Sequence, residues 1–251
     1  MIRVKSSSEL QKMLKANEIA AQALALAGRS IKAGMSTWEL DKIVHDYIVS
    51  KGAIPSSLGY GGFPNSACIS VNEELIHGIP SKKKIIKEGD IVSVDITALY
   101  DGWQGDNART FRVGQVSERA ERLLRVTEEA LYKGIEQAVP GHRVGDISAA
   151  VQKYVEENGY HVVRQYVGHG IGTEMHEDPE VPNFGKAGRG PRLVPGMTIC
   201  IEPMVNETTP DVYVRADKWT VVEANNNLSA HFEHCIAITN GAPMIMTLEK
   251  H

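Results

Sequence analysis

Hydrophobic and polar residues alternate along residues 91–98, IVSVDITA, and this pattern predicts a β-strand with one buried face. Asp101-Gly102 follows and favours a two-residue hairpin loop. With that loop, Asp95 pairs with position 108, and Asp106 lies diagonally across from Asp95 on the polar face. Two ionised carboxylates at that spacing repel each other unless a proton or a cation lies between them. Acidic residues on a strand often simply face water, so the rest of the chain must decide whether this pair forms a site.

Two amphipathic helices are predicted before this hairpin. Ser6-x-x-Glu9 and Ser36-x-x-Glu39 are capping boxes, and each precedes a run with apolar residues at helical spacing. The first run extends to Ala27, and Gly52 ends the second.

A shift of 107 residues places the first half of the chain on the second half with matching residue types. The matched pairs are Leu40 with Ile147, Val44 with Val151, Tyr47 with Tyr154, Gly52 with Gly159, Gly89 with Gly196, and Asp95 with Glu202. We therefore expect a single domain over residues 1–251 that contains two similar halves, about 1–110 and 111–240. The expected fold is α+β, with two pseudo-symmetric halves whose antiparallel sheets join around a central cleft, and with helices outside. The pseudo-twofold would place Asp95 and Glu202 opposite each other in this cleft.

The composition is that of an ordinary soluble globular protein. The 251 residues are 42% hydrophobic and 23% charged, with a formal net charge of −4. No basic face favours nucleic acid, and the run Lys82–Lys84 is interpreted as a solvated turn. Neither a signal peptide nor a membrane span is predicted, and three widely spaced cysteines indicate reduced thiols. We expect a cytoplasmic protein with no DNA and no membrane as partners.

Further polar groups of the second half complete a candidate site. Glu202 and Glu233 each lie on the strand face opposite to apolar residues, and glycines flank His169 so that backbone or a ligand can approach its ring. The combined set is Asp95, Asp106, His169, Glu202 and Glu233.

This set predicts two divalent metal ions. Four carboxylates bring four negative charges into one cleft, where desolvating each unpaired carboxylate costs several kcal/mol. Two divalent cations would balance that charge. One imidazole and four oxygen donors without a thiolate suit Co, Mn, Fe(II) or Zn, whereas calcium seldom accepts nitrogen ligands. Carboxylates that bridge two such ions form a hydrolytic two-metal centre.

Five segments of the chain closely resemble type I methionine aminopeptidases, which belong to the pita-bread metallopeptidases. They are GHGIGTEMHEDPEVPNFG (168–185), IEPMV (201–205), HGIP (77–80), DIVSVDITALYDGWQGDNARTF (90–111) and SAHFEHCI (229–236). The resemblance spans essentially the whole chain. It implies a single catalytic domain that removes the initiator methionine from nascent proteins and peptides. It places Asp95 and Asp106 on one metal, His169 and Glu202 on the other, and Asp106 and Glu233 as bridges.

The resemblance also implies roles for two further histidines. A hydroxide between the metals would attack the first peptide bond, His77 would orient the peptide, and His176 would stabilise the oxyanion. Without the motifs, each would be interpreted as a histidine satisfied by backbone groups. Glu202 is the candidate proton shuttle because it is both a ligand and a carboxylate beside the hydroxide. We expect a monomer that acts on peptide N-termini and contacts the ribosome transiently.

A methionine pocket should be apolar and polarisable. Matching family positions suggest Tyr60, Phe63, Cys68 and Trp219, although each could equally be a core residue. Three departures from the family pattern are expected to tune the site: Met175 replaces the usual aromatic residue, His231-Phe232 replaces the commonest Gln-Tyr, and Cys235 replaces the usual threonine. We include Met175 among the substrate-binding residues.

Two other functions compete with this hypothesis. A prolidase or proline-specific aminopeptidase would share all five ligands, but the chain is expected to lack the N-terminal domain of prolidases. It is also expected to lack the helical insertion of type II enzymes, since only 33 residues separate His169 from Glu202. A non-catalytic peptide-binding module of the same fold could lose ligands freely, and here all five are present.

Overall fold

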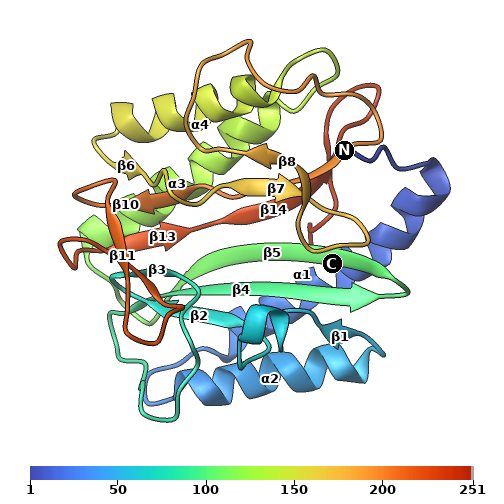
Figure 1. Cartoon of the computed structure of the whole chain (residues 1–251). Helices are drawn as coiled ribbons and strands as arrows, with labels where there is room; N and C mark the ends of the chain where they lie inside the picture. Colours follow the sequence, from blue (N-terminus) through green and yellow to red (C-terminus); the bar gives the residue numbers. More distant parts are fainter. Residues whose placement is uncertain (250–251) are drawn as a thin grey trace.

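Four α-helices lie outside a central antiparallel sheet in a computed structural model that describes residues 1–249 (Figure 1). They are α1 (Ser7–Ser30), α2 (Thr37–Ser50), α3 (Glu118–Glu136) and α4 (Val144–Glu157). A short 3-10 turn, η1 (Tyr60–Gly62), follows α2. Helices α1 and α2 cover the first half of the sheet, and α3 and α4 cover the second half (Figure 1).

Both predicted capping boxes are confirmed. The Ser6 hydroxyl accepts from the backbone N–H of Glu9, whose carboxylate accepts from the Ser6 N–H at 2.8 Å. Ser36 and Glu39 repeat this exchange at the start of α2. These bonds satisfy backbone donors that a helix N-terminus otherwise leaves unpaired, so both helices begin where local sequence predicts.

We propose that the two halves arose by internal duplication, about 1–110 and 111–240. The bounds of α2, shifted by 107 residues, coincide with those of α4. The glycines that end these helices, Gly52 and Gly159, have φ of 72° and 82°. Gly89 and Gly196, which precede equivalent strands, have φ of 86° and 92°. Repeated left-handed glycines at one offset support a repeated backbone path.

The central sheet has the strand order β1-β4-β5-β14-β9-β7-β8, with β2 beside β4 and β15 beside β14. Its strands are β1 (Ile54–Pro55), β2 (Cys68–Val71), β4 (Ile91–Tyr100), β5 (Trp103–Arg112), β7 (Gly168–Gly170), β8 (Glu177–Val181), β9 (Thr198–Ile201), β14 (Glu233–Ala237) and β15 (Met244–Ile245). Two smaller sheets have the orders β13-β10-β6 and β11-β12-β3. Their strands are β3 (Glu74–Ile76), β6 (His161–Val162), β10 (Met204–Asn206), β11 (Val212–Val214), β12 (Val221–Glu223) and β13 (Ser229–His231).

The register of the β4–β5 hairpin is the predicted one. Asp95 pairs with Ala108, and Asp106 pairs with Thr97, two positions further along. Strands β5 and β14 then join the two halves, with Glu233 opposite Ala108. The hairpin and this junction therefore bring acids from both halves to the centre of the sheet.

Each half has its own hydrophobic core between the helices and the outer face of the sheet. In the first half, Leu40 and Val44 of α2 pack in one cluster with Val94 of β4. In the second, Ile147 and Val151 of α4 cluster with strand residues of β9 and β14. Burying one face of each strand leaves the alternate residues on the other face for the cleft. In the described chain, none of the helices combines the length and the apolar character needed to cross a membrane.

Candidate metal centre and substrate cleft

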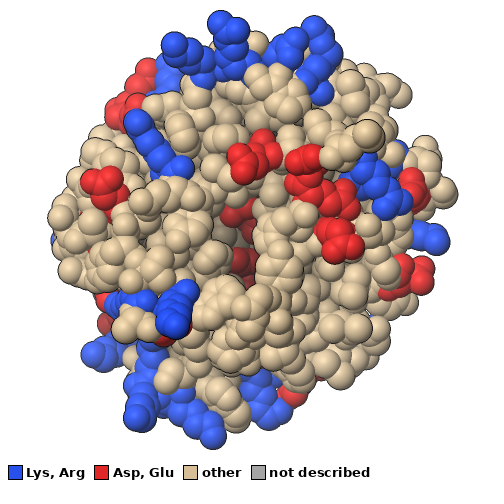
Figure 2. Space-filling view, in the orientation of Figure 1, with Lys and Arg blue, Asp and Glu red and all other residues tan. Residues whose placement is uncertain are grey.

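Strand periodicity brings the five predicted ligands to one side of the central sheet. Asp95 lies in β4, Asp106 in β5, His169 in β7 and Glu233 in β14, while Glu202 directly follows β9. All five line a single cavity of about 210 Å³. Figure 2 shows acidic side chains deep in a hollow near the middle of this face. The structure thus brings the whole predicted set together.

The ring of His169 lies between two carboxylates. Its Nε2 is 3.5 Å from Oε1 of Glu202 and 3.8 Å from Oδ2 of Asp106. Its Nδ1 lies 2.9 Å from the carbonyl oxygen of Gly170. A carbonyl only accepts, so Nδ1 carries the proton and Nε2 directs its lone pair at the acids. Burial lowers the pKa of His169 to about 4, which keeps the ring neutral, as a metal ligand must be.

Glycines beside His169 allow neighbouring strands to approach. A Cβ on Gly168 would lie 2.4 Å from the carbonyl oxygen of Cys200, and one on Gly170 would lie 2.1 Å from that of Asp178. Of the two explanations open from sequence, close backbone approach is the one observed. These glycines therefore let β8 and β9 hold His169 from both sides.

Asp106, His169, Cys200 and Glu233 each offer one ligand atom within 4.8 Å of the others. Cys200 was not in the predicted set, although it shares a strand face with Glu202. Burial raises the pKa of its thiol well above the usual value, and contact with Cys235 adds to this rise. The group is therefore a neutral thiol, and the charged donors remain oxygen atoms.

The charged forms of the four carboxylates are disfavoured, because these groups are buried. Burial raises the pKa of Asp95 to about 6 and that of Glu202 to about 8. Burial, followed by the charges of Asp95 and Glu202, raises the pKa of Asp106 well above its usual value. Burial and the neighbouring acids do the same for Glu233, whose Oε1 is buried without a hydrogen-bond partner. A divalent cation would satisfy this oxygen and reverse these shifts, so the donor set fits a metal site.

The predicted substrate residues line the walls of the same cavity. They are Tyr60, Phe63, Cys68, His77, Met175, His176 and Trp219. Phe63 and Trp219 meet edge to face with ring centroids 5.2 Å apart, and Cys68 is buried beside them in the lining. The apolar members of this set, Phe63, Cys68, Met175 and Trp219, are of the kind that a methionine pocket requires.

Two further histidines, His77 and His176, line the cavity that contains the acids. The His176 ring centroid is 4.4 Å from that of His169, and its Nδ1 is 2.7 Å from the Tyr60 hydroxyl. His77 adopts φ 56°, a conformation rare for a residue with a side chain. Burial lowers the pKa of His77 to about 4 and also lowers that of His176. Both rings are therefore neutral, and the strained backbone at His77 is the kind that functional sites retain.

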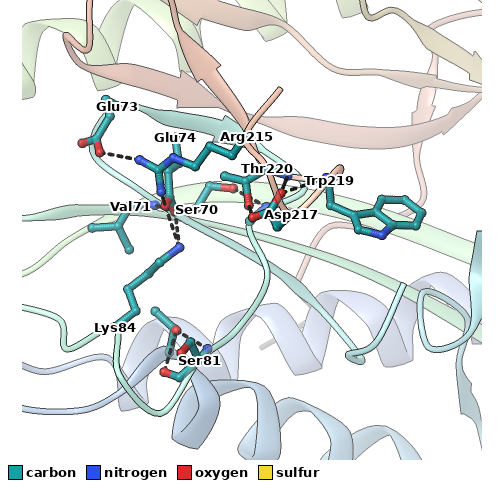
Figure 3. A network of polar contacts seen from close by, with 12 residues as sticks. Ser70, Val71, Glu73, Glu74, Ser81, Lys84, Arg215, Asp217, Trp219 and Thr220 are labelled. Atoms are coloured by element: carbon teal, nitrogen blue, oxygen red, sulfur yellow. Dashed lines mark hydrogen bonds and ion pairs between the residues drawn. The ribbon is translucent and has the colours of Figure 1, made fainter. Parts of the chain in front are cut away.

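The loop that carries Trp219 is held by a polar network (Figure 3). Asp217 accepts from the backbone N–H of Trp219 at 2.9 Å and from the hydroxyl of Thr220 at 2.6 Å. Arg215 pairs with the buried carboxylate of Glu74. The loop that carries Trp219 is thereby tied to β3, the strand that leads to His77.

The interpretation of residues 82–84 as a solvated turn is wrong for Lys84. Its ammonium group lies 2.6 Å from Oε1 and 2.7 Å from Oε2 of Glu74 (Figure 3), so it is not a merely solvated turn residue. Thr97 lies on the same strand face as Asp95, as the alternation predicts. The Thr97 hydroxyl donates to the carboxylate of Asp106 at 3.0 Å. Tyr166, which also lines the cavity, follows no periodic segment and was missed.

Comparison with known proteins matches the profile of metallopeptidase family M24 to residues 11–240. Methionine aminopeptidase of Clostridium acetobutylicum is 52% identical over 248 residues, which cover 99% of each chain. The crystal structure of methionine aminopeptidase from Thermotoga maritima is 46% identical with a TM-score of 0.97, over 99% of this chain and 100% of that one. A prolidase structure from Pyrococcus horikoshii is 26% identical with a TM-score of 0.76, over 99% of this chain but 64% of that one.

Proposed function

The chain belongs to metallopeptidase family M24, and from this premise we propose that it is a methionine aminopeptidase, which removes the first methionine from proteins and peptides. The pita-bread fold predicted from the sequence is confirmed by the likeness to the structures described above. Its substrates are peptides with a free N-terminus, as the names of its relatives imply. The observation that carries the proposal is the convergence of Asp95, Asp106, His169, Glu202 and Glu233 on one cavity with an apolar wall.

These five residues would hold the divalent metal on which the family depends. We propose two ions, of Co, Mn, Fe(II) or Zn, which would be held by Asp95, Asp106, His169, Glu202 and Glu233. Four carboxylates balance two such ions in charge. Ions held there supply Lewis-acid chemistry, which activates water near neutral pH and polarises the scissile carbonyl.

Glu202 is positioned to move the proton. Its carboxylate lies 3.5 Å from Nε2 of His169 and lines the same cavity as the other acids. A carboxylate at this position can take a proton from water and return it to the departing amine. We assign this transfer to Glu202.

The neutral histidines are suited to hold the substrate. The Tyr60 hydroxyl can donate to Nδ1 of His176, which then carries its proton on Nε2, facing the cleft. We assign the stabilisation of the oxyanion to this N–H, because a donor fixed in a partly buried site needs no reorganisation during the reaction. We assign His77, on the adjoining wall, to the peptide group next to the scissile bond.

The apolar wall would select the first side chain. Phe63, Cys68, Met175 and Trp219 present polarisable surfaces to the cavity. A free α-amine would bring its charge to the acidic floor, which the interior of a chain cannot do. We propose that the enzyme acts in the cytoplasm as a monomer with transient ribosome contact, and its buried free cysteines agree with a reducing compartment.

Hydrolysis of Met-Ala-Ser by metal-depleted protein, before and after addition of single metals, tests the proposal. We expect activity only after addition, and little turnover of Ala-Pro peptides. Preferential cleavage of Ala-Pro would favour the proline-specific alternative. Binding of no divalent ion above background would instead favour a peptide-binding module.

A further inference from the structure

His231 is a buried histidine whose ring has no hydrogen-bond partner. Its exposed fraction is 1%, and both Nδ1 and Nε2 are unpaired among the described residues. An unpaired polar group in the interior costs about 1–3 kcal/mol. The backbone around it is fixed on both sides, since the His231 N–H donates to the Thr110 hydroxyl at 3.0 Å and the His231 carbonyl accepts from it at 2.9 Å. The backbone is thus fixed at His231, while the ring itself makes no hydrogen bond to the described residues.

The nearest charged group to this ring is Glu202. Nε2 of His231 lies 3.5 Å from Oε2 of Glu202, while Oε1 of the same carboxylate lies 3.5 Å from Nε2 of His169. The Glu202 carboxylate therefore stands between two imidazoles, one on each oxygen. Within residues 1–249, no hydrogen bond reaches this carboxylate, and the bond from Asn183 goes to the backbone carbonyl of Glu202.

We propose that His231 is a positioning residue for Glu202, holding Oε2 through an Nε2–H so that Oε1 is presented to the metal beside His169. This inference rests on the proposed function and adds a residue to its metal centre. Rotation about the last bond of a glutamate side chain is soft, so a free carboxylate can turn either oxygen to the metal. Partners behind a metal ligand commonly remove this freedom.

Direct ligation by His231 is the less favoured arrangement. Its Nε2 lies 3.5 Å from Oε2 of Glu202, whereas the other oxygen of that carboxylate, Oε1, is the one that approaches His169. A hydrogen-bond donor fits this position better than a second nitrogen ligand does.

Three variants of the full-length chain separate the possibilities. His231→Leu removes both nitrogens at similar volume. In His231→Gln, the amide nitrogen reaches about as far as Nε2, whereas in His231→Asn it reaches only as far as Nδ1. His234→Leu is the matched control, because His234 lies in β14 next to Glu233, outside the cavity lining, and its Nδ1 pairs with the Thr247 hydroxyl.

The affinity of metal-depleted protein for Mn²⁺ is measured by titration calorimetry, together with the melting temperature of each metal-free variant. We expect His231→Leu and His231→Asn to weaken Mn²⁺ binding about 10- to 100-fold. His231→Gln and His234→Leu should stay close to wild type. Unchanged affinity in His231→Leu would overturn the inference, as would His231→Gln as weak as His231→Leu.

The same experiments distinguish a variant that does not fold from failure of the proposed metal centre. If His231→Leu does not fold, the contrast between His231→Gln and His231→Asn decides, since both keep an amide of similar polarity. Equal affinity in that pair would overturn the inference. Wild-type protein that bound no Mn²⁺ would refute the proposed metal centre itself, whereas normal wild-type binding with unaffected variants refutes only the role of His231.

Discussion

The hydroxyl of Tyr60 lies 2.7 Å from Nδ1 of His176 and joins η1 to the loop that precedes β8. With the tyrosine as the donor, as proposed above, the proton of the imidazole lies on Nε2. Tyr60→Phe should therefore lower kcat on the order of tenfold, less than the loss of an oxyanion donor itself. Metal content should not change.

Steady-state kinetics with Met-Ala-Ser and metal analysis of the same samples check this prediction. His176→Ala provides the reference, since it removes the donor and should lose more activity than Tyr60→Phe. Equal kcat in Tyr60→Phe and wild type would show that the tyrosine does not orient His176.

The ligand set predicts a contrast between two groups of variants. His169→Ala and Glu202→Ala should each lose at least one metal and nearly all turnover, because they remove donors. His77→Ala should keep its metal while kcat/KM falls about 10²-fold. Plasma emission analysis of dialysed protein measures the metal. Full occupancy in His169→Ala would contradict its assignment as a ligand, and metal loss in His77→Ala would show that its role is misassigned.

Arg215 should control how well the enzyme recognises methionine. Its ion pair with Glu74 ties the Trp219 loop to β3 (Figure 3), and Arg215→Met would release that loop. We expect KM for methionyl peptides to rise up to about tenfold, with kcat changed less, because the loop shapes the pocket wall. Arg215→Lys should restore part of the effect. If KM stays at the wild-type value in Arg215→Met, the network supports the fold alone.

The stability of the metal-free protein should fall as pH rises from about 6.5 to about 8, above the range in which the buried neutral histidines act in the opposite direction. Burial raises the pKa of Glu202 from 4.5 to about 8 and that of Asp95 from 3.8 to about 6. Between those values the folded state binds more protons than the unfolded state, so the free energy of unfolding decreases with rising pH. Melting curves with a chelator at several pH values measure this slope.

The same melting curves with saturating Mn²⁺ provide the control. Metal binds the deprotonated carboxylates and replaces the missing positive charge, so its stabilising effect should grow over the same pH range. A metal-free melting temperature that rises towards pH 8 would show that these acids do not repel one another in the folded state.

Much of this protein is determined by local sequence. The register of Asp95 against Ala108 follows from a two-residue loop, because the side-chain period of a strand leaves no other pairing once the turn is set. Ser6 and Ser36 begin their helices through bonds that span three residues. The five ligand residues could be collected because strand alternation assigns each acid to a face, and the 107-residue repeat brings both halves to one cleft.

Only the tertiary structure decided which side chains meet across distant segments. Sequence period indicates a face but not the neighbour on that face. The sequence therefore did not predict that Cys200 lies among the possible ligand atoms. It also did not predict that Lys84, in a run of three lysines, pairs with the buried Glu74. His231 could be noted as an unusual residue, yet its contact with Glu202 depends on how β13 pairs with β10, where His231 lies opposite Met204. Such contacts arise from packing between elements, where geometry rather than local preference sets the partner.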